Sequence, residues 1–286
     1  MRVAKSVGGI LALCIILFSL QVNTSSCQKE VVTDTLYIKD TLTIRDTIRI
    51  VDSSNCNCYD LNDGLVAYYN FNGGNLNDSS GYNNQISFNN AVKTADRFGR
   101  ANNAYQFNGT SSYMQVPNSA SLNPSNGITL MAIFKPTGFY NGNCSVNQVF
   151  GKGWNDYIDG HYTIRFVSAA GCNAPTDTSR EYAYGAYGNL NGRPSAADEA
   201  TYLHTNQWYN IVYTYTNGVA SLYINGVLKK TVNANLAFTA NNQELFIGKH
   251  GDPQYPYWFN GAVDEVRIYN KGLCAAAVKQ LYGLKQ

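Results

Sequence analysis

From residue 64 to the C-terminus, short alternating or aromatic runs are separated by segments rich in Asn, Gly, Ser and Pro. A period of two favours β-strands, because successive side chains of a strand point to opposite faces. The predicted strands are 65–71, 104–107, 113–116, 128–135, 148–152, 161–167, 181–187, 208–216, 219–224, 227–232, 245–248 and 261–269. Only 274–282 has a convincing helical pattern. The chain is therefore predicted to be all-β, a two-sheet antiparallel jelly-roll sandwich with a short C-terminal helix.

Two Asn-Gly pairs stand between predicted strands, Asn217-Gly218 and Asn225-Gly226. Asn and Gly accept the positive φ angles that a two-residue hairpin turn requires. These pairs predict a three-stranded antiparallel meander over 208–232.

A six-residue repeat precedes this region, in which Asp34, Asp40 and Asp46 each begin a unit. Ile and Leu fall mainly on even positions, while Thr, Tyr, Lys and Arg fill the odd ones, so an extended strand keeps one apolar face throughout. The repeat predicts an extended stalk that lifts the domain from a membrane. The alternative is self-association of chains through the Ile/Leu edge.

The N-terminus has the order of a secretory signal: Arg2 and Lys5, a thirteen-residue apolar run over 8–20, then small residues before Cys27. The segment Thr24-Ser-Ser-Cys27 resembles a bacterial lipobox, in which Cys27 is acylated and becomes the mature N-terminus. Ordinary signal cleavage is the alternative. The predicted divisions are a signal peptide at 1–26, a lipidated stalk at 27–58 and one domain at 59–286, in a lipoprotein of the outer membrane or cell surface.

Composition narrows the possible partners. Hydrophobic residues make up 44% of the chain, enough for a buried core, and charged residues only 14%. Arg2 and Lys5 account for the formal charge of +2, so the chain after the signal is neutral. Neutrality argues against electrostatic capture of nucleic acid or of an anionic membrane, which leaves the lipid anchor as the expected membrane contact.

Several motifs carry a family resemblance. They are Gly64-Leu-Val-Ala-Tyr-Tyr-Asn-Phe71 with Asn77-Asp-Ser-Ser-Gly81, Phe107-Asn-Gly-Thr-Ser-Ser-Tyr113, Trp208-Tyr-Asn-Ile-Val-Tyr213, Ser221-Leu-Tyr-Ile-Asn-Gly226 and Phe259-Asn-Gly-Ala-Val-Asp-Glu-Val-Arg-Ile-Tyr-Asn270. In this order they resemble the laminin-G-like, concanavalin A-like lectin/glucanase jelly roll. The resemblance implies two antiparallel sheets with neighbouring first and last strands. It leaves function open, since lectins, adhesion modules and glycosidases share the fold.

Catalytic carboxylates are not evident. A glycosidase needs two carboxyl groups across its cleft, about 5–9.5 Å apart. The chain has five Glu and no Glu-x-Asp-x-x-Glu pattern, and the adjacent Asp264 and Glu265 are expected on opposite faces of their strand. His161, His204 and His250 accompany no Gly-x-Ser-x-Gly motif, and His204 is predicted to be a turn residue. We therefore predict a protein that is not an enzyme.

Aromatic loops suggest binding instead, because sugar rings stack on Tyr and Trp while amides and carboxylates bind their hydroxyls. The candidate ligand-binding residues form one loop: His250, Asp252, Tyr255, Tyr257 and Trp258. A similar loop occupies 154–161, and core packing remains an alternative for these rings. The leading hypothesis is non-catalytic binding of a glycan or polysaccharide. The rival is a structural or adhesive module that recognises a protein partner in a surface complex.

Five cysteines follow Cys27, and in an oxidising compartment thiols tend to pair. Cys144 and Cys172 flank two predicted neighbouring strands, which predicts a Cys144–Cys172 bridge. If the first and last strands are neighbours, Cys56 or Cys58 lies near Cys274, and Cys58–Cys274 is the predicted second bridge. A zinc site at Cys56 and Cys58 is an outside alternative.

The family resemblance also implies a structural Ca²⁺ site where the first and last strands converge. The turn over 77–84 is rich in oxygen ligands, with Asp78 foremost, and Asp264 is the candidate on the last strand. In the alternative, Asp78 caps the turn, and Asp264 pairs with Arg267 or another cation.

Overall fold

The computed structural model divides the chain into two compact units, residues 1–53 and 54–286, each described here by itself. The described residues are 33–34, 47–48, 59–140, 142, 145–153, 160–168, 181–188, 195–198, 202–233 and 238–284. In the first unit, β1 (Thr33–Asp34) pairs antiparallel with β2 (Thr47–Ile48). Cys27 and the predicted signal peptide lie outside the described residues, so the lipid anchor and the role of the stalk stay predictions.

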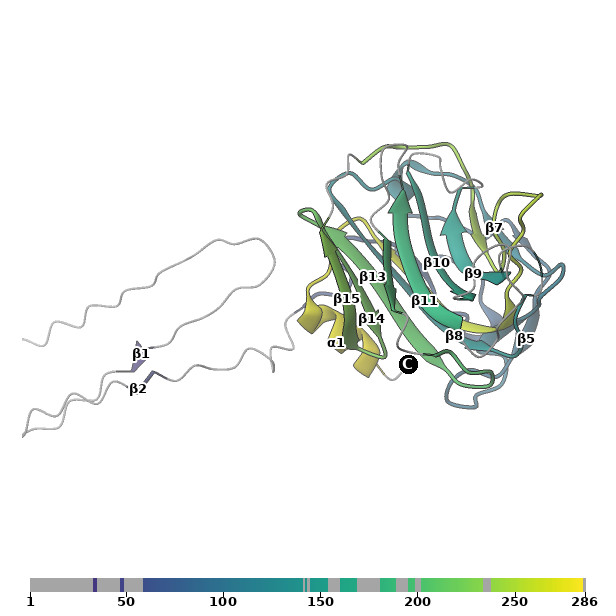
Figure 1. The fold of residues 1–286 in the computed structure, drawn as a ribbon, viewed down its shortest axis with the longest axis horizontal. Helices are drawn as coiled ribbons and strands as arrows, with labels where there is room; N and C mark the ends of the chain where they lie inside the picture. The colour runs from purple at the N-terminus through teal and green to yellow at the C-terminus, as the bar shows by residue number, and fades with distance from the viewer. Residues whose placement is uncertain are drawn as a thin grey trace, which may run out of the picture. The chain divides into compact units, whose positions relative to one another are not determined.

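The second unit is a sandwich of two antiparallel sheets (Figure 1). The eight-stranded sheet contains β15 (Val227–Asn233), β14 (Val219–Ile224), β13 (Tyr209–Thr216), β8 (Gly127–Pro136), β17 (Asn260–Tyr269), β6 (Ala104–Asn108) and β5 (Val92–Thr94) in that order, and β3 (Leu65–Tyr69) also pairs with β17. The seven-stranded sheet has the order β12 (Ser195–Asp198), β11 (Glu181–Gly188), β10 (His161–Ser168), β9 (Val146–Lys152), β16 (Leu245–Ile247), β7 (Met114–Val116) and β4 (Phe88–Asn89). The antiparallel pairing of β3 with β17 confirms that the first and last strands of the domain are neighbours.

The main core lies between the two sheets, and alternate residues of the strands enter it. On β10, Tyr162, Ile164 and Phe166 all enter this core, and on β16 Leu245 and Ile247 do the same. Burial of aromatic and aliphatic side chains from both sheets is the main favourable contribution to folding.

A second, smaller core covers the outer face of the eight-stranded sheet. The helix α1 (Ala275–Gly283) packs Ala277, Val278 and Leu281 there, against residues of β8, β13, β14 and β17. Figure 1 shows α1 beside β13, β14 and β15. Among the described residues, no helix is long and apolar enough to cross a membrane.

The predicted strands, the helix and the meander are all confirmed. At both predicted hairpin turns Asn and Gly adopt positive φ, with 49° and 76° at Asn217-Gly218 and 51° and 74° at Asn225-Gly226. The sequence pattern missed three short strands, β4, β5 and β12.

Candidate functional site

A row of paired residues defines the outer face of the seven-stranded sheet. Phe88 and Phe246 are each the partner of Gln115, Phe246 also pairs with Gly151, and Gly151 pairs with Thr163. Directly paired residues of an antiparallel sheet lie on the same face. Because the neighbours of Phe246 along β16 point into the main core, this row faces away from it.

Four aromatic rings gather at the β4 end of this face, and we call Phe88, Tyr113, Phe246 and Trp258 the aromatic cluster. The ring of Tyr113 lies 4.6 Å from that of Phe88 and 6.2 Å from those of Phe246 and Trp258, measured between centroids. Phe88 is 42% exposed, Tyr113 and Trp258 are half-buried, and Phe246 is buried. The cluster therefore presents ring surface to solvent.

Lys249 places its ammonium group among these rings. Its Nζ is 4.8 Å from the ring centroid of Tyr113, 4.9 Å from that of Phe246 and 5.5 Å from that of Trp258. Partial burial lowers the pKa of Lys249, and the negative charge of Glu244 opposes that shift. Glu244 Oε1 accepts a hydrogen bond of 2.6 Å from Gln115 Nε2.

The structure divides the five loop residues proposed from sequence. Trp258 belongs to the aromatic cluster, and Tyr255 and Tyr257 are half-buried with their rings stacked 6.2 Å apart. His250 is buried, with Nδ1 3.1 Å from the Tyr255 carbonyl oxygen, and Asp252 Oδ1 accepts a turn hydrogen bond of 2.8 Å from the backbone of Gln254. His250 and Asp252 thus make hydrogen bonds within the loop, while the three aromatic side chains are partly accessible.

The loop is fixed to β9 by its backbone. The N–H of Gln148 donates to the carbonyl of Tyr257 at 2.9 Å, and Tyr257 has a φ of 42°, which is strained for a bulky residue. Next to this contact, Thr163 and Arg165 of β10 are buried although they lie on the outer face of their strand. Both side-chain amide atoms of Gln148 are also buried there, and within the described residues they have no hydrogen-bond partner.

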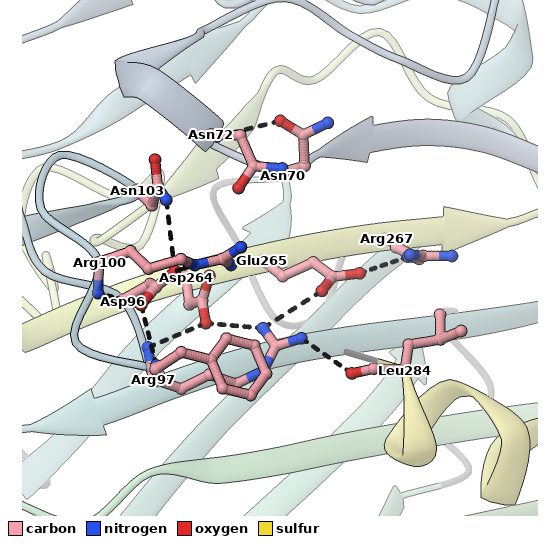
Figure 2. Close-up of polar contacts among 11 residues, drawn as sticks. Asn70, Asn72, Asp96, Arg97, Arg100, Asn103, Asp264, Glu265, Arg267 and Leu284 are labelled. Carbon is pink, nitrogen blue, oxygen red and sulfur yellow. Dashed lines mark hydrogen bonds and ion pairs between the residues drawn. The ribbon is translucent and has the colours of Figure 1, made fainter. Parts of the chain in front are cut away.

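A separate ion-pair network lies at the eight-stranded sheet (Figure 2). Arg97 Nη1 is 2.6 Å from Asp264 Oδ2 and 3.5 Å from Glu265 Oε2, and Arg267 Nε is 2.5 Å from Glu265 Oε1. The expectation that Asp264 and Glu265 point to opposite faces is therefore wrong. The register of β17 against β8 shifts between Val263 and Glu265, and such a bulge breaks the alternation of side chains.

Burial of Asp264 raises the pKa of its carboxyl group to about 6, although the adjacent Arg97 guanidinium acts in the opposite direction. Asp78 caps its loop: its carboxylate accepts hydrogen bonds from the backbone N–H groups of Tyr68, Ser80 and Asn84, each at 2.9 Å. In the described part of the chain, no group of three or more His, Cys, Asp and Glu residues could hold a metal ion. The Ca²⁺ site at Asp78 and Asp264 stays a prediction, and both carboxylates have protein donors.

The predicted disulfides also stay predictions, because Cys58, Cys144 and Cys172 lie outside the described residues. Cys274 is half-buried at the residue before α1 and packs against the second core. Tyr59, the residue after Cys58, contacts the same core.

Comparison with known proteins places these features in a family. The laminin G-like family of the concanavalin A-like lectin/glucanases superfamily matches residues 108–279, more than half of the chain. The chain belongs to the concanavalin A-like lectin/glucanases superfamily. No curated protein sequence matches it.

Solved structures share this superfamily fold. Domain 4 of AbnA, an extracellular arabinanase from Geobacillus stearothermophilus, in complex with arabinotriose, is 23% identical with a TM-score of 0.54, and the match covers 76% of this chain and 98% of that one. A structure of botulinum neurotoxin type C, a toxin whose cell entry depends on interaction with two ganglioside molecules, is 13% identical with a TM-score of 0.56. The match covers 77% of this chain and 51% of that one. The binding domain of botulinum neurotoxin DC with rat synaptotagmin II is 14% identical (TM-score 0.56, 77% and 51%). This chain spans about half the length of the two toxin chains.

Sequence reasoning missed several residues of the face that this superfamily fold creates, namely Phe88, Tyr113, Phe246, Lys249 and Gln148. Tyr113 and Phe246 stood in predicted strands, but the order of the strands was unknown. Phe88 lies in a two-residue strand, too short for a periodic signal. Lys249 directly precedes the proposed loop, and this position was the only feature of the sequence that pointed to a role in binding.

Proposed function

We propose that this chain is a cell-surface lipoprotein whose jelly roll binds carbohydrate without cleaving it. The observation that carries the proposal is the solvent-facing aromatic cluster on the outer face of the seven-stranded sheet, next to the loop over 250–258. Sugar rings have an apolar C–H face that packs on Tyr and Trp, and neighbouring polar groups bind the hydroxyls. The arabinotriose complex of the arabinanase domain supports this use of the fold.

The arrangement of carboxylates supports binding rather than hydrolysis. Asp264 and Glu265 lie together, but both are buried and each contacts a guanidinium group. Glycosidase carboxylates must flank a bound sugar, and one of them must act as an acid. Among the described residues, Glu244 is the carboxylate that acts electrostatically on Lys249 at the aromatic cluster, and it accepts a hydrogen bond from Gln115.

A protein partner is the second candidate, and one observation favours it. Phe98 is 47% exposed, and the guanidinium carbons of Arg97 and Arg100 lie 4.7 and 5.1 Å from its ring centroid. Exposed aromatic and Arg side chains are enriched at the centres of protein interfaces. The synaptotagmin complex of the toxin domain supports a protein-binding use of this fold.

The test is binding of the full chain to a glycan array, followed by titration of the bound glycan with two variants. We expect Trp258→Ala to weaken affinity roughly tenfold or more, since a buried ring contact contributes about 1–3 kcal/mol. Trp208→Ala is the matched control, because Trp208 is also half-buried with a lysine, Lys135, over its ring, but packs at the eight-stranded sheet. Equal losses for both variants, or binding to no glycan, would contradict the proposal.

A further inference from the structure

We propose that the glycan bound at the aromatic cluster carries a carboxylate group, as a uronic acid does, and that Lys249 binds this carboxylate. The inference rests on the proposed glycan-binding function and names the class of sugar. It starts from the position of Lys249 Nζ, within 5.5 Å of three ring centroids on an accessible face.

The ammonium group of Lys249 has unused hydrogen-bond donors. In the part of the chain that the structure describes, Nζ donates no hydrogen bond and forms no ion pair, so its protein contacts are the three ring faces. Lys152 shows the opposite situation: it is fully buried, and its Nζ donates to Asn123 Oδ1 and the Asn241 carbonyl, each at 3.0 Å, and to Asn241 Oδ1. The buried ammonium group of Lys152 therefore has oxygen acceptors for its hydrogen bonds, whereas the ammonium group of Lys249 has no such acceptor among the described residues.

Glu244, the acidic residue that acts on Lys249, forms no ion pair with it. Glu244 acts on the ammonium electrostatically, but its Oε1 accepts a hydrogen bond from Gln115. A positive charge therefore remains on the ring cluster, partly withdrawn from solvent. Partial burial reduces screening, so a charge-assisted hydrogen bond to a ligand is stronger here than on an open surface.

The chemistry that fits is a sugar ring with one negative charge on it. The aromatic cluster offers ring faces and edges to the C–H groups of a pyranose, while Lys249 offers N–H donors to a carboxylate. Cation–π contacts with three rings restrict the position of the ammonium, which lowers the entropy lost when the carboxylate binds. A sulfate ester has the same charge, so the experiment must separate the two.

The experiment is calorimetric titration of the full chain with three acidic oligosaccharides, prepared from polygalacturonate, alginate and glucuronoxylan. Each is compared with its carboxyl-reduced, neutral counterpart, and sulfated galactan and neutral arabinan, laminarin and mannan complete the set. We expect at least one acidic oligosaccharide to bind, and its reduced counterpart to bind roughly ten- to a hundredfold more weakly, the value of a hydrogen bond to a charged group.

Variants assign the effect to the residue. Lys249→Met keeps the aliphatic stem over the rings and should abolish the preference for the acidic form, whereas Lys249→Arg keeps the charge and should retain it. Lys135→Met, over Trp208 at the other sheet, is the matched control and should leave the preference intact. An NMR titration of the lysine side chains gives an independent readout: the pKa of Lys249 should rise when the carboxylate binds.

The outcomes separate the inference from the function on which it rests. Equal binding of acidic and reduced forms, or binding of neutral glycans alone, would overturn the carboxylate assignment and leave glycan binding standing. Binding of the sulfated glycan alone would overturn the choice of carboxylate. If no member of the set binds, both the inference and the proposed function fail.

Discussion

The two outer faces of the sandwich differ in whether their charged side chains form ion pairs. On the eight-stranded sheet, Asp264 and Glu265 are buried and paired with Arg97 and Arg267 (Figure 2), and α1 covers the neighbouring apolar residues. On the seven-stranded sheet, aromatic rings reach solvent, and among the described residues the ammonium of Lys249 lies over three rings without a hydrogen bond or an ion pair. The buried carboxylates of the first face are paired within the chain, while we propose that the second face binds a ligand.

The largest effect on stability should come from removing a partner of the buried ion pairs on the eight-stranded sheet. Arg97→Ala removes the cation nearest Asp264 and leaves a buried carboxylate uncompensated, which costs about 3–5 kcal/mol in the free energy of unfolding. Lys271→Ala, which removes an exposed ion pair with Asp63, should cost about 1 kcal/mol or less. Urea unfolding of the full chain measures both, and equal losses would show that the buried network has no special role.

A second prediction concerns pH on the same face. Burial raises the pKa of Asp264 from 3.8 to about 6 in the folded chain. Between these values the unfolded chain has released the proton that the folded chain still binds, so the contribution of Asp264 to stability is fully present below pH 4 and is lost as the pH rises through 6. The loss is about 1.4 kcal/mol per pH unit, about 3 kcal/mol in all.

Asp264→Asn removes this titration, so the change in stability from pH 4 to pH 6 should be more favourable in the variant than in the wild type by about 2 kcal/mol. The comparison uses the difference between two chains, so other titrating groups cancel where they are unaffected. A wild-type curve that rises from pH 4 to 6, with the same slope in the variant, would contradict the prediction.

The fold was predictable because most strands alternate in polarity over five or more residues and are bounded by turn signals. The missed strands lack that information: β5 has exposed or half-buried residues only, and β12 is Ser-Ala-Ala-Asp, whose residues have little preference for strands. These segments become strands because neighbours supply hydrogen-bond partners. Local sequence cannot reveal such pairing.

The site was predictable only in part, because it joins segments far apart in the chain. The ring of Trp258 was identified from its loop, but its neighbour Tyr113 precedes β7, and Phe88, the next ring of the cluster, lies in β4. The period-two rule failed at Asp264 and Glu265, since one bulge in β17 places both carboxylates against Arg97. A bulge depends on the partner strand and leaves no reliable mark on the residues themselves.

The smallest expected effect on stability tests the distinction between the faces most directly. Phe88 and Phe98 are similarly exposed, at 42% and 47%. Phe88 lies in the seven-stranded sheet, whereas Phe98 lies beside Arg97, which contacts the eight-stranded sheet. Replacing either by Ala removes a ring that is nearly half exposed, so each variant should lose only about 1 kcal/mol in unfolding free energy. Phe88→Ala should nevertheless weaken glycan binding about two- to tenfold, because the ring of Tyr113 loses its neighbour at 4.6 Å and the ligand loses ring surface. Phe98→Ala should leave the affinity unchanged. The reverse result, with Phe98→Ala alone weakening binding, would move the glycan site to the side of Arg97.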